Sequence, residues 1–287
     1  MNIDQKILAC VDGNSVSEAV ADYAAWAARK LGTPLELLHV LDRHAALSAE
    51  QDHSGAIGLD AQEKLLDQLS KEDEARTRSA REAGRLFLNR LRERARMAGA
   101  GTVDTRLRHG DIEETLSEQQ EGSRLLVLGR AGSQSSAEKP GLGKHLEWVV
   151  RSLKRPVLVA TETYREPTRV LFAFDGSSVT RKGVEMLADS PLLTGLPLVL
   201  LMAGAPGSAA TRQLELAVQT LKNAGIDVSS FIVRGTPQEA ITRELNTQGF
   251  DLLIMGAYSH SPLRSLFMGS KTTDLLKASR VPTLLLR

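Results

Sequence analysis

Small and hydroxyl-bearing residues stand at phosphate-binding spacing near the end of the chain. Gly256-Ala-Tyr-Ser259 closes the apolar run LLIM, and nine residues later Gly269-Ser270 precedes KTTDLLKAS, a segment with the pattern of a helix. Glycine lets the backbone approach a ligand closely, and the first turn of a helix offers free N–H groups and a positive dipole end to a phosphate. Ser270 adds a hydroxyl donor at the same place. The spacing therefore predicts an anion site.

Two aspartates, Asp12 and Asp175, mark an internal repeat. Residues 6–13 are KILACVDG and residues 169–176 are RVLFAFDG. In both, an apolar run ends in Asp-Gly, which is the pattern of a buried strand that runs into a turn. An aspartate at this point can accept a hydrogen bond from the amino group of a base or from a ribose hydroxyl. It can equally cap the helix that follows, and both interpretations stay open.

Further landmarks recur in the same order. Val40 and Ala203 each lie 28 residues after the repeated aspartate, and SRLLVLGRAG in the first half matches FDLLIMGAYS in the second. The repeat predicts two domains, at 1–162 and 167–287. The repeated Asp and Gly are 117 residues apart in the first domain and 81 in the second, so 36 extra residues form an insertion at about 42–83.

Strands that alternate with helices predict a parallel sheet with helices on both faces. Because crossover connections are right-handed, each half is expected to be a doubly wound α/β domain with a five-stranded parallel sheet. Ligands bind such sheets at the carboxyl ends of the strands, where the strand order reverses, and the repeated aspartates and glycines fall there. The last strands, residues 155–160 and 281–286, would otherwise leave apolar edges exposed.

The composition excludes several classes of protein. Hydrophobic residues make up 42% and charged residues 25%, and the net charge is +1, which gives no support to a nucleic-acid-binding or membrane-surface protein. Cys10 is the single cysteine, so a disulfide framework is excluded, and the histidines show no metal-ligand spacing. The start MNIDQK lacks the pattern of a signal peptide. A cytoplasmic location is therefore expected.

The pattern G-x2-G-x9-G-[S/T] after LLIMG resembles the nucleotide loop of universal stress proteins. The stretches VLFAFDGS and MGAYSHSPLRSLFMGS are similar to that family's usual sequences at these positions. The resemblance covers nearly the whole chain as two tandem copies. It implies a five-stranded α/β domain in each copy. It also implies that some members hold ATP or a related nucleotide, with or without Mg²⁺, and that the last strands of two domains pair. Residues 155–160 would then lie beside 281–286 in an internal pseudo-dimer.

The resemblance carries over to two sets of nucleotide-binding candidates. The second-copy set, which is the better site, is Asp175, Ala203, Gly256, Ser259, Gly269, Ser270 and Lys271. The weaker first-copy set is Asp12, Val40, Gly129, Gly132, Gly143 and Lys144. In the second copy, Ser259 stands where the family has a glycine, which is a mild departure. In the first copy one residue is inserted and Lys144 replaces the hydroxyl residue, so that loop departs further from the family pattern.

Residues 71–96 are dense in both signs of charge and predict a long solvated helix that the insertion extends. Its core-facing stripe is expected to consist of Leu86, Phe87, Leu91 and Ala95. Trp26 and Trp148 are interpreted as anchors of the core or of a contact between the domains.

Three functions remain open. The first is a stress-response or regulatory protein that binds ATP or a related adenine nucleotide without committed catalysis. The second is a slow ATP-hydrolysing enzyme on the same site, although the sequence has no P-loop and no G-x-S-x-G elbow. The third is a nucleotide-free scaffold that binds a partner. No catalytic residue and no metal ligand is assigned, and a further homodimer is left open.

Overall fold

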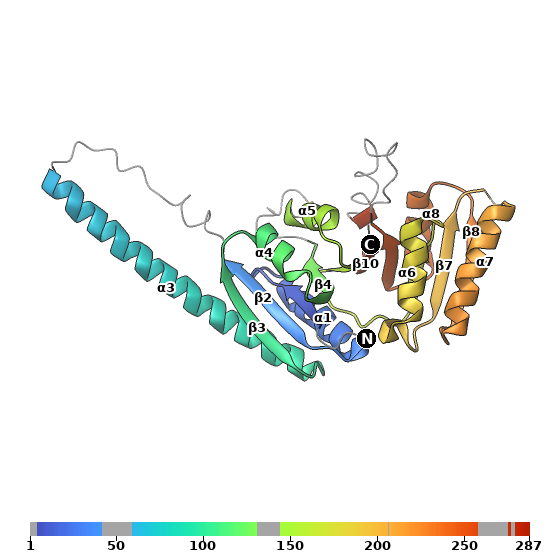
Figure 1. Cartoon of the computed structure of the whole chain (residues 1–287), viewed down its shortest axis with the longest axis horizontal. Coiled ribbons are helices and arrows are strands. Elements are labelled where there is room, and N and C mark those ends of the chain that lie inside the picture. The colour runs from blue at the N-terminus through green and yellow to red at the C-terminus, as the bar shows by residue number, and fades with distance from the viewer. Residues whose placement is uncertain (1–4, 42–58, 131–143, 206, 258–274, 277–278) are drawn as a thin grey trace.

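Ten strands form one sheet in the computed structural model, in the order β3-β2-β1-β4-β5-β10-β9-β6-β7-β8 (Figure 1). The structure describes residues 5–41, 59–130, 144–205, 207–257, 275–276 and 279–287. For residues 59–70, 72–73, 144–145, 147 and 150 only the backbone is described.

Among the described residues, the first half of the chain supplies five strands and four helices. They are β1 (Lys6–Cys10), α1 (Ser17–Leu31), β2 (Leu35–Leu41), α3 (Leu59–Met97), β3 (Val103–His109), α4 (Ile112–Gln119), β4 (Ser123–Gly129), α5 (Lys144–Ser152) and β5 (Val157–Ala160). The second half repeats the pattern with β6 (Val170–Ala173), α6 (Ser178–Ala188), the short 3-10 helix η1 (Pro191–Leu193), β7 (Leu198–Ala203), α7 (Ser208–Asn223), β8 (Val228–Val233), α8 (Pro237–Thr247), β9 (Leu252–Gly256) and β10 (Thr283–Leu286).

Within each half all neighbouring strands are parallel. The strand order reverses beside the first strand of each half, because β1 lies between β2 and β4, and β6 lies between β7 and β9. The halves meet where β5 pairs with β10 in the antiparallel sense, with Leu158 opposite Leu284. The fold class that the sequence predicts, two tandem doubly wound five-stranded units, is confirmed.

Two apolar layers cover the sheet, one on each face. Helices α1, α3, α6 and α7 contribute buried side chains to one layer, and α4, α5 and α8 contribute to the other. The strands are buried on both sides, which explains their nearly continuous apolar sequences. Each layer contains residues from both halves, so the hydrophobic core runs across the β5–β10 junction.

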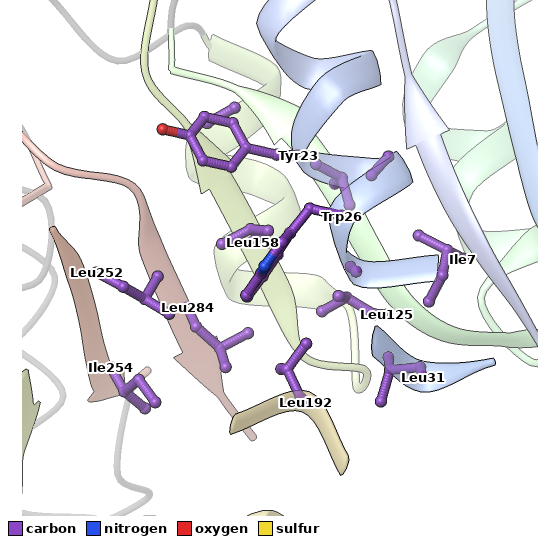
Figure 2. Packing of buried hydrophobic residues seen from close by; sticks show 14 of the residues in the cluster. Ile7, Tyr23, Trp26, Leu31, Leu125, Leu158, Leu192, Leu252, Ile254 and Leu284 are labelled. Carbon is purple, nitrogen blue, oxygen red and sulfur yellow. The ribbon is translucent and has the colours of Figure 1, made fainter. Parts of the chain in front are cut away.

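Trp26 packs where the two halves meet. The side chain is 1% exposed, and Figure 2 shows it directed toward Leu158 of β5, beside Leu284 of β10 and Leu192 of η1. Trp26 is therefore both a core residue and an anchor of the contact between the halves. Trp148, by contrast, is half-buried and packs against the layer on the other face.

Helix α1 also holds the segment that joins the halves. The Tyr23 hydroxyl lies 3.3 Å from Thr161 Oγ1 and accepts a hydrogen bond of 3.3 Å from the backbone N–H of Arg165. Six residues further along α1, Arg29 pairs with Glu166 at 2.7 Å, and Lys30 donates to the carbonyl of Thr194 at 3.0 Å. The C-terminal part of α1 is therefore tied to the joining segment and, through Lys30, to the second half of the chain.

Helix α3 extends well beyond the sheet (Figure 1). It is 39 residues long, which corresponds to about 58 Å. Its buried stripe is Gly84, Leu88, Leu91 and Ala95, with Phe87 half-buried. The expected stripe was wrong at one position: Leu86 is 62% exposed, because it lies on the opposite side of the helix from Leu88. None of the helices that the structure describes has the length and apolar content needed to cross a membrane.

Candidate functional site

The carboxyl ends of β6, β7 and β9 bring three of the second-copy candidates to one edge of the sheet. Ala173 of β6 lies in register with Met255 of β9 on one side and with Leu201 of β7 on the other. Asp175 follows β6, Gly256 ends β9 and Ala203 ends β7. These positions lie where the strand order reverses, which is where open α/β sheets bind ligands.

Asp175 is held at the start of α6 and still faces solvent. Its Oδ1 accepts hydrogen bonds from the Ser177 backbone N–H at 3.0 Å and from Thr180 Oγ1 at 2.7 Å. Ser177 itself caps α6, and Thr180 is 1% exposed. Asp175 is exposed, and among the described residues no hydrogen bond uses its Oδ2. The carboxylate therefore combines a fixed orientation with one oxygen that can accept a ligand hydrogen bond.

Close packing at the same edge favours a glycine at position 256. A Cβ atom on this residue would lie 3.2 Å from Thr180 Cγ2 and 3.4 Å from Val179 Cγ1. The first turn of α6 thus lies directly against the last residue of β9. A larger side chain would push apart the two elements that carry Asp175 and Gly256, so the glycine preserves the geometry of the edge.

Of the remaining second-copy candidates, Ala203 alone lies within the described residues. Ala203 is half-buried, and the next residue, Gly204, donates its N–H to the Val233 carbonyl at 2.8 Å with φ of +141°. The backbone therefore turns away directly after Ala203. Four candidates lie outside the described residues: Ser259, Gly269, Ser270 and Lys271.

The first-copy edge has the same layout but a different hydrogen-bond pattern. Asp12 follows β1, Gly129 ends β4 and Val40 lies near the end of β2. Both carboxylate oxygens of Asp12 are engaged: Oδ1 accepts from Ser17 Oγ at 3.3 Å, and Oδ2 accepts from Asn14 Nδ2 at 3.2 Å. The carboxylate is thus more fully occupied by its own loop than its counterpart in the second half.

Arg130, which the sequence patterns did not single out, follows Gly129 at this edge. Its Nη2 donates to the Val281 carbonyl of the second half at 3.2 Å. Burial lowers the pKa of its guanidinium, while the carboxylate of Glu162 acts in the opposite direction. Ala257 stands at the matching position in the second half. The sequence signal that could have identified Arg130 is therefore the difference between LVLGR in the first half and LIMGA in the second.

Other groups near the first-copy edge are occupied by the fold. His39 places Nδ1 2.7 Å from the Val11 carbonyl and its ring against Phe87. Burial, with a smaller contribution from the Asp12 carboxylate, raises the pKa of the Cys10 thiol, which keeps the thiol neutral. Gly132 and Gly143 lie outside the described residues, and Lys144 begins α5 with its side chain outside them. No group of three or more His, Cys, Asp or Glu side chains suited to a metal ion occurs in the described part of the chain.

Comparison with known proteins agrees with this architecture. The pattern of the Universal stress protein family matches residues 5–161 and again residues 167–287. Universal stress protein Slr1230 of Synechocystis sp. (strain ATCC 27184 / PCC 6803 / Kazusa) is 32% identical over 286 residues, which span 99% of this chain and 100% of that protein.

Solved structures share the fold at lower identity. A universal stress protein from Archaeoglobus fulgidus DSM 4304 superposes with a TM-score of 0.68 at 19% identity, over 99% of this chain and 98% of that one. Protein PA1789 from Pseudomonas aeruginosa PAO1, described as functionally unknown, superposes with a TM-score of 0.61 at 20% identity, over 98% and 92%. The chain belongs to the universal stress protein family and carries two copies of the family's domain in tandem.

Proposed function

We propose that this chain is a stress-response regulatory protein that binds ATP or a related adenine nucleotide, with the better site at the carboxyl edge of β6 and β9. The observation that carries the proposal is the meeting of Asp175 and Gly256 at the point of strand reversal. One oxygen of Asp175 has its position set by α6, and the other can accept a hydrogen bond from a base amino group or a ribose hydroxyl.

The phosphates are assigned to the segment that follows Gly256. Its sequence brings Ser259, then Gly269 and Ser270, and then Lys271, which is the order that the family resemblance connects with ribose and phosphate contacts. Backbone N–H groups at a helix start and a hydroxyl donor suit a polyanion. A Lys adds a point charge, and a Mg²⁺ ion bound with the nucleotide would reduce the phosphate charge further.

The first-copy site is proposed as the weaker of the two. Asn14 and Ser17 occupy both oxygens of Asp12, and Arg130 directs an N–H toward the second half of the chain. Lys144 replaces the hydroxyl residue in the loop. We therefore expect this half to bind nucleotide weakly or not at all.

Slow ATP hydrolysis on the same site and a nucleotide-free scaffold are the competing functions. At the described second-copy edge, Asp175 is the one carboxylate of the candidate set, and a hydrolase needs a positioned base together with phosphate-stabilising groups. A cytoplasmic location and domain limits at 1–162 and 167–287 belong to the same proposal.

A matched pair of substitutions tests the site. Gly269→Asp places a carboxylate in the second-copy loop, and Gly143→Asp makes the same change at the matching position of the first copy. We expect Gly269→Asp to weaken ATP binding at least about 100-fold, which corresponds to about 2.7 kcal/mol, because a carboxylate repels phosphate. Gly143→Asp should leave the tight site unchanged. The measurement is calorimetric titration with ATP, with and without Mg²⁺.

Each competing function has its own outcome in the same experiment. Unchanged ATP affinity in Gly269→Asp would show that the site is elsewhere. Release of phosphate from ATP by the wild type, lost in Gly269→Asp, would establish hydrolysis. Absence of ATP binding by the wild type would favour the scaffold.

A further inference from the structure

Strand β8 is one of the two outer strands of the ten-stranded sheet, and β3 is the other. Figure 1 shows them toward opposite ends of the sheet. Among the described strands, β8 pairs with β7 alone. An outer strand presents a row of backbone N–H and C=O groups to which a further strand can bind. The two edges can therefore be compared for how well each resists such pairing.

The hydrogen bonds between β7 and β8 show which backbone groups of β8 point outward. The carbonyls of Asp227 and Val233 each accept a hydrogen bond of 2.8 Å from a backbone N–H of residues 198–204. Backbone groups alternate in direction along a strand. The residues that direct their N–H and C=O groups away from β7 are therefore Val228, Ser230 and Ile232. No described residue forms a hydrogen bond with these outward groups.

The side chains of the two outer strands differ in charge. Strand β3 carries Asp104, Arg106 and Arg108, and charged residues on an outer strand discourage pairing with another chain. Strand β8 has the sequence VSSFIV, which contains no charged residue. By the register of the two halves, Phe231 stands at the position of Arg106 and Val233 at that of Arg108. The charges that protect the first edge are thus absent from β8.

Three consecutive apolar residues of β8 are incompletely covered. Phe231, Ile232 and Val233 pack against the apolar layers of the sheet but are only half-buried. A strand placed beside β8 would cover them further. An uncharged six-residue segment with β-branched and aromatic residues and no proline is the type of sequence that pairs readily with other strands. Backbone and side chains of β8 therefore both suit a further strand.

We propose that β8 pairs in the antiparallel sense with β8 of a second copy of this chain, so that the two sheets join into one. The outward groups fit a two-fold axis at Ser230. With the axis there, Ser230 faces Ser230 of the second copy, and Val228 faces Ile232. Facing residues of this kind exchange two hydrogen bonds in an antiparallel pair. Both molecules then use the same surface, as a two-fold contact requires.

The charges at the two ends of β8 favour this occupant and this direction. Asp227 precedes the strand and Arg234 follows it, and both are exposed. Antiparallel pairing brings the Asp227 end of each strand beside the Arg234 end of the other, whereas parallel pairing would bring like charges together. A second β8 thus supplies matching backbone groups, apolar side chains and charges. The contact lies at the opposite end of the second half from the β5–β10 junction and leaves that junction intact.

Ser230 provides the direct test because it would lie opposite itself. Ser230→Lys and Ser230→Glu each place like charges in facing positions, which destabilises a strand pair. The wild type is expected to sediment at equilibrium as a dimer of the 31.1 kDa chain at low ionic strength. Each variant alone should show a dimer dissociation constant raised at least about fivefold. An equimolar mixture of the two variants places opposite charges at the axis and should restore the dimer.

The matched control makes the same changes on the other outer strand. Thr105 occupies the position of β3 that corresponds to Ser230, so Thr105→Lys and Thr105→Glu should dimerise as the wild type does. Ser230→Pro gives a second measurement that does not depend on charge. Its missing N–H points away from β7, where an outer strand tolerates proline, but the central pair of the dimer would lose its hydrogen bonds. This variant should therefore be monomeric at concentrations where the wild type is dimeric.

Far-ultraviolet circular dichroism should show equal secondary structure in all these proteins. A monomeric wild type overturns the proposal. So do folded Ser230 variants that dimerise as well as the wild type, and so does a Lys and Glu mixture that stays monomeric. Equal loss of the dimer in the Thr105 and Ser230 variants would show that the contact is not specific to β8.

Discussion

At the scale of single residues, two nearly identical sequences place an aspartate in different hydrogen-bond arrangements. VDGNSVS and FDGSSVT both place an aspartate after a strand, yet Asn14 takes one oxygen of Asp12, whereas Ser177 and Thr180 both use the same oxygen of Asp175. Sequence spacing located both aspartates at the sheet edge. It could not show which oxygen stays open, because that depends on side-chain rotamers.

Asp175 can be tested separately from its role at the start of α6. Asp175→Ala should weaken ATP binding at least about tenfold, since a hydrogen bond to a charged group contributes about 1.5–3 kcal/mol. Ser177→Ala removes the side-chain cap of α6 and should lower the free energy of unfolding by about 1 kcal/mol. It should leave the ATP affinity within about threefold, or less than 0.7 kcal/mol. Equal losses of affinity in the two variants, measured by titration, would mean that Asp175 acts through the helix start alone.

Leu86 shows how helical spacing misleads when apolar residues are adjacent. Leu86, Phe87 and Leu88 follow one another, so several stripes fit the pattern. Counting back from Ala95 in steps of four, three and four gives Leu91, Leu88 and Gly84, which is the stripe that packs. Gly84 has no side chain, so it adds nothing to the apolar pattern of the sequence. A Cβ atom there would come within 3.0 Å of Leu107. The stripe is therefore set by the neighbouring strand as much as by the helix.

At the scale of elements, the repeat predicted the strands well because each is short, apolar and followed by a turn signal. The lengths of helices were harder to predict. The insertion at about 42–83 was placed by comparing the two halves, but an extension of α3 beyond the sheet follows from the backbone course of residues 59–83, which no spacing rule supplies. The contact of Arg130 with the Val281 carbonyl in the other half was likewise not predictable, because the two residues approach each other only in the folded chain.

Strand β10 is the element on which the junction depends. Deleting residues 281–287 removes three buried leucines of β10 and leaves β5 and β9 with unpaired edges. The loss of several buried leucines, each worth about 2–5 kcal/mol, approaches the whole stability of a typical domain. We expect aggregation, detected by size-exclusion chromatography with light scattering. Deleting Arg287 alone keeps the strand and should leave the protein monodisperse, whereas a soluble and monodisperse long truncation would contradict the pairing of β5 with β10.

At the scale of the whole molecule, one sheet and two continuous apolar layers join domains that differ in what their edges offer. The junction at β5 and β10 and the packing of Trp26 connect the halves. The second-half edge presents an aspartate with an open oxygen, and the first-half edge presents one engaged by its own loop. The first half instead carries the long helix α3. The account is thus of two halves with the same fold whose sheet edges offer a ligand different hydrogen-bonding groups.

The measurement that tests this account most directly is the nucleotide content of the purified protein. The wild type, prepared without added nucleotide, is denatured and the released small molecules are quantified by mass spectrometry, with ATP added in a parallel sample that is then desalted. The account predicts one adenine nucleotide for each chain, because the tight site is proposed for the second half and the first-half site is proposed to be weaker. A protein that releases no nucleotide and retains none after ATP is added would contradict the central claim.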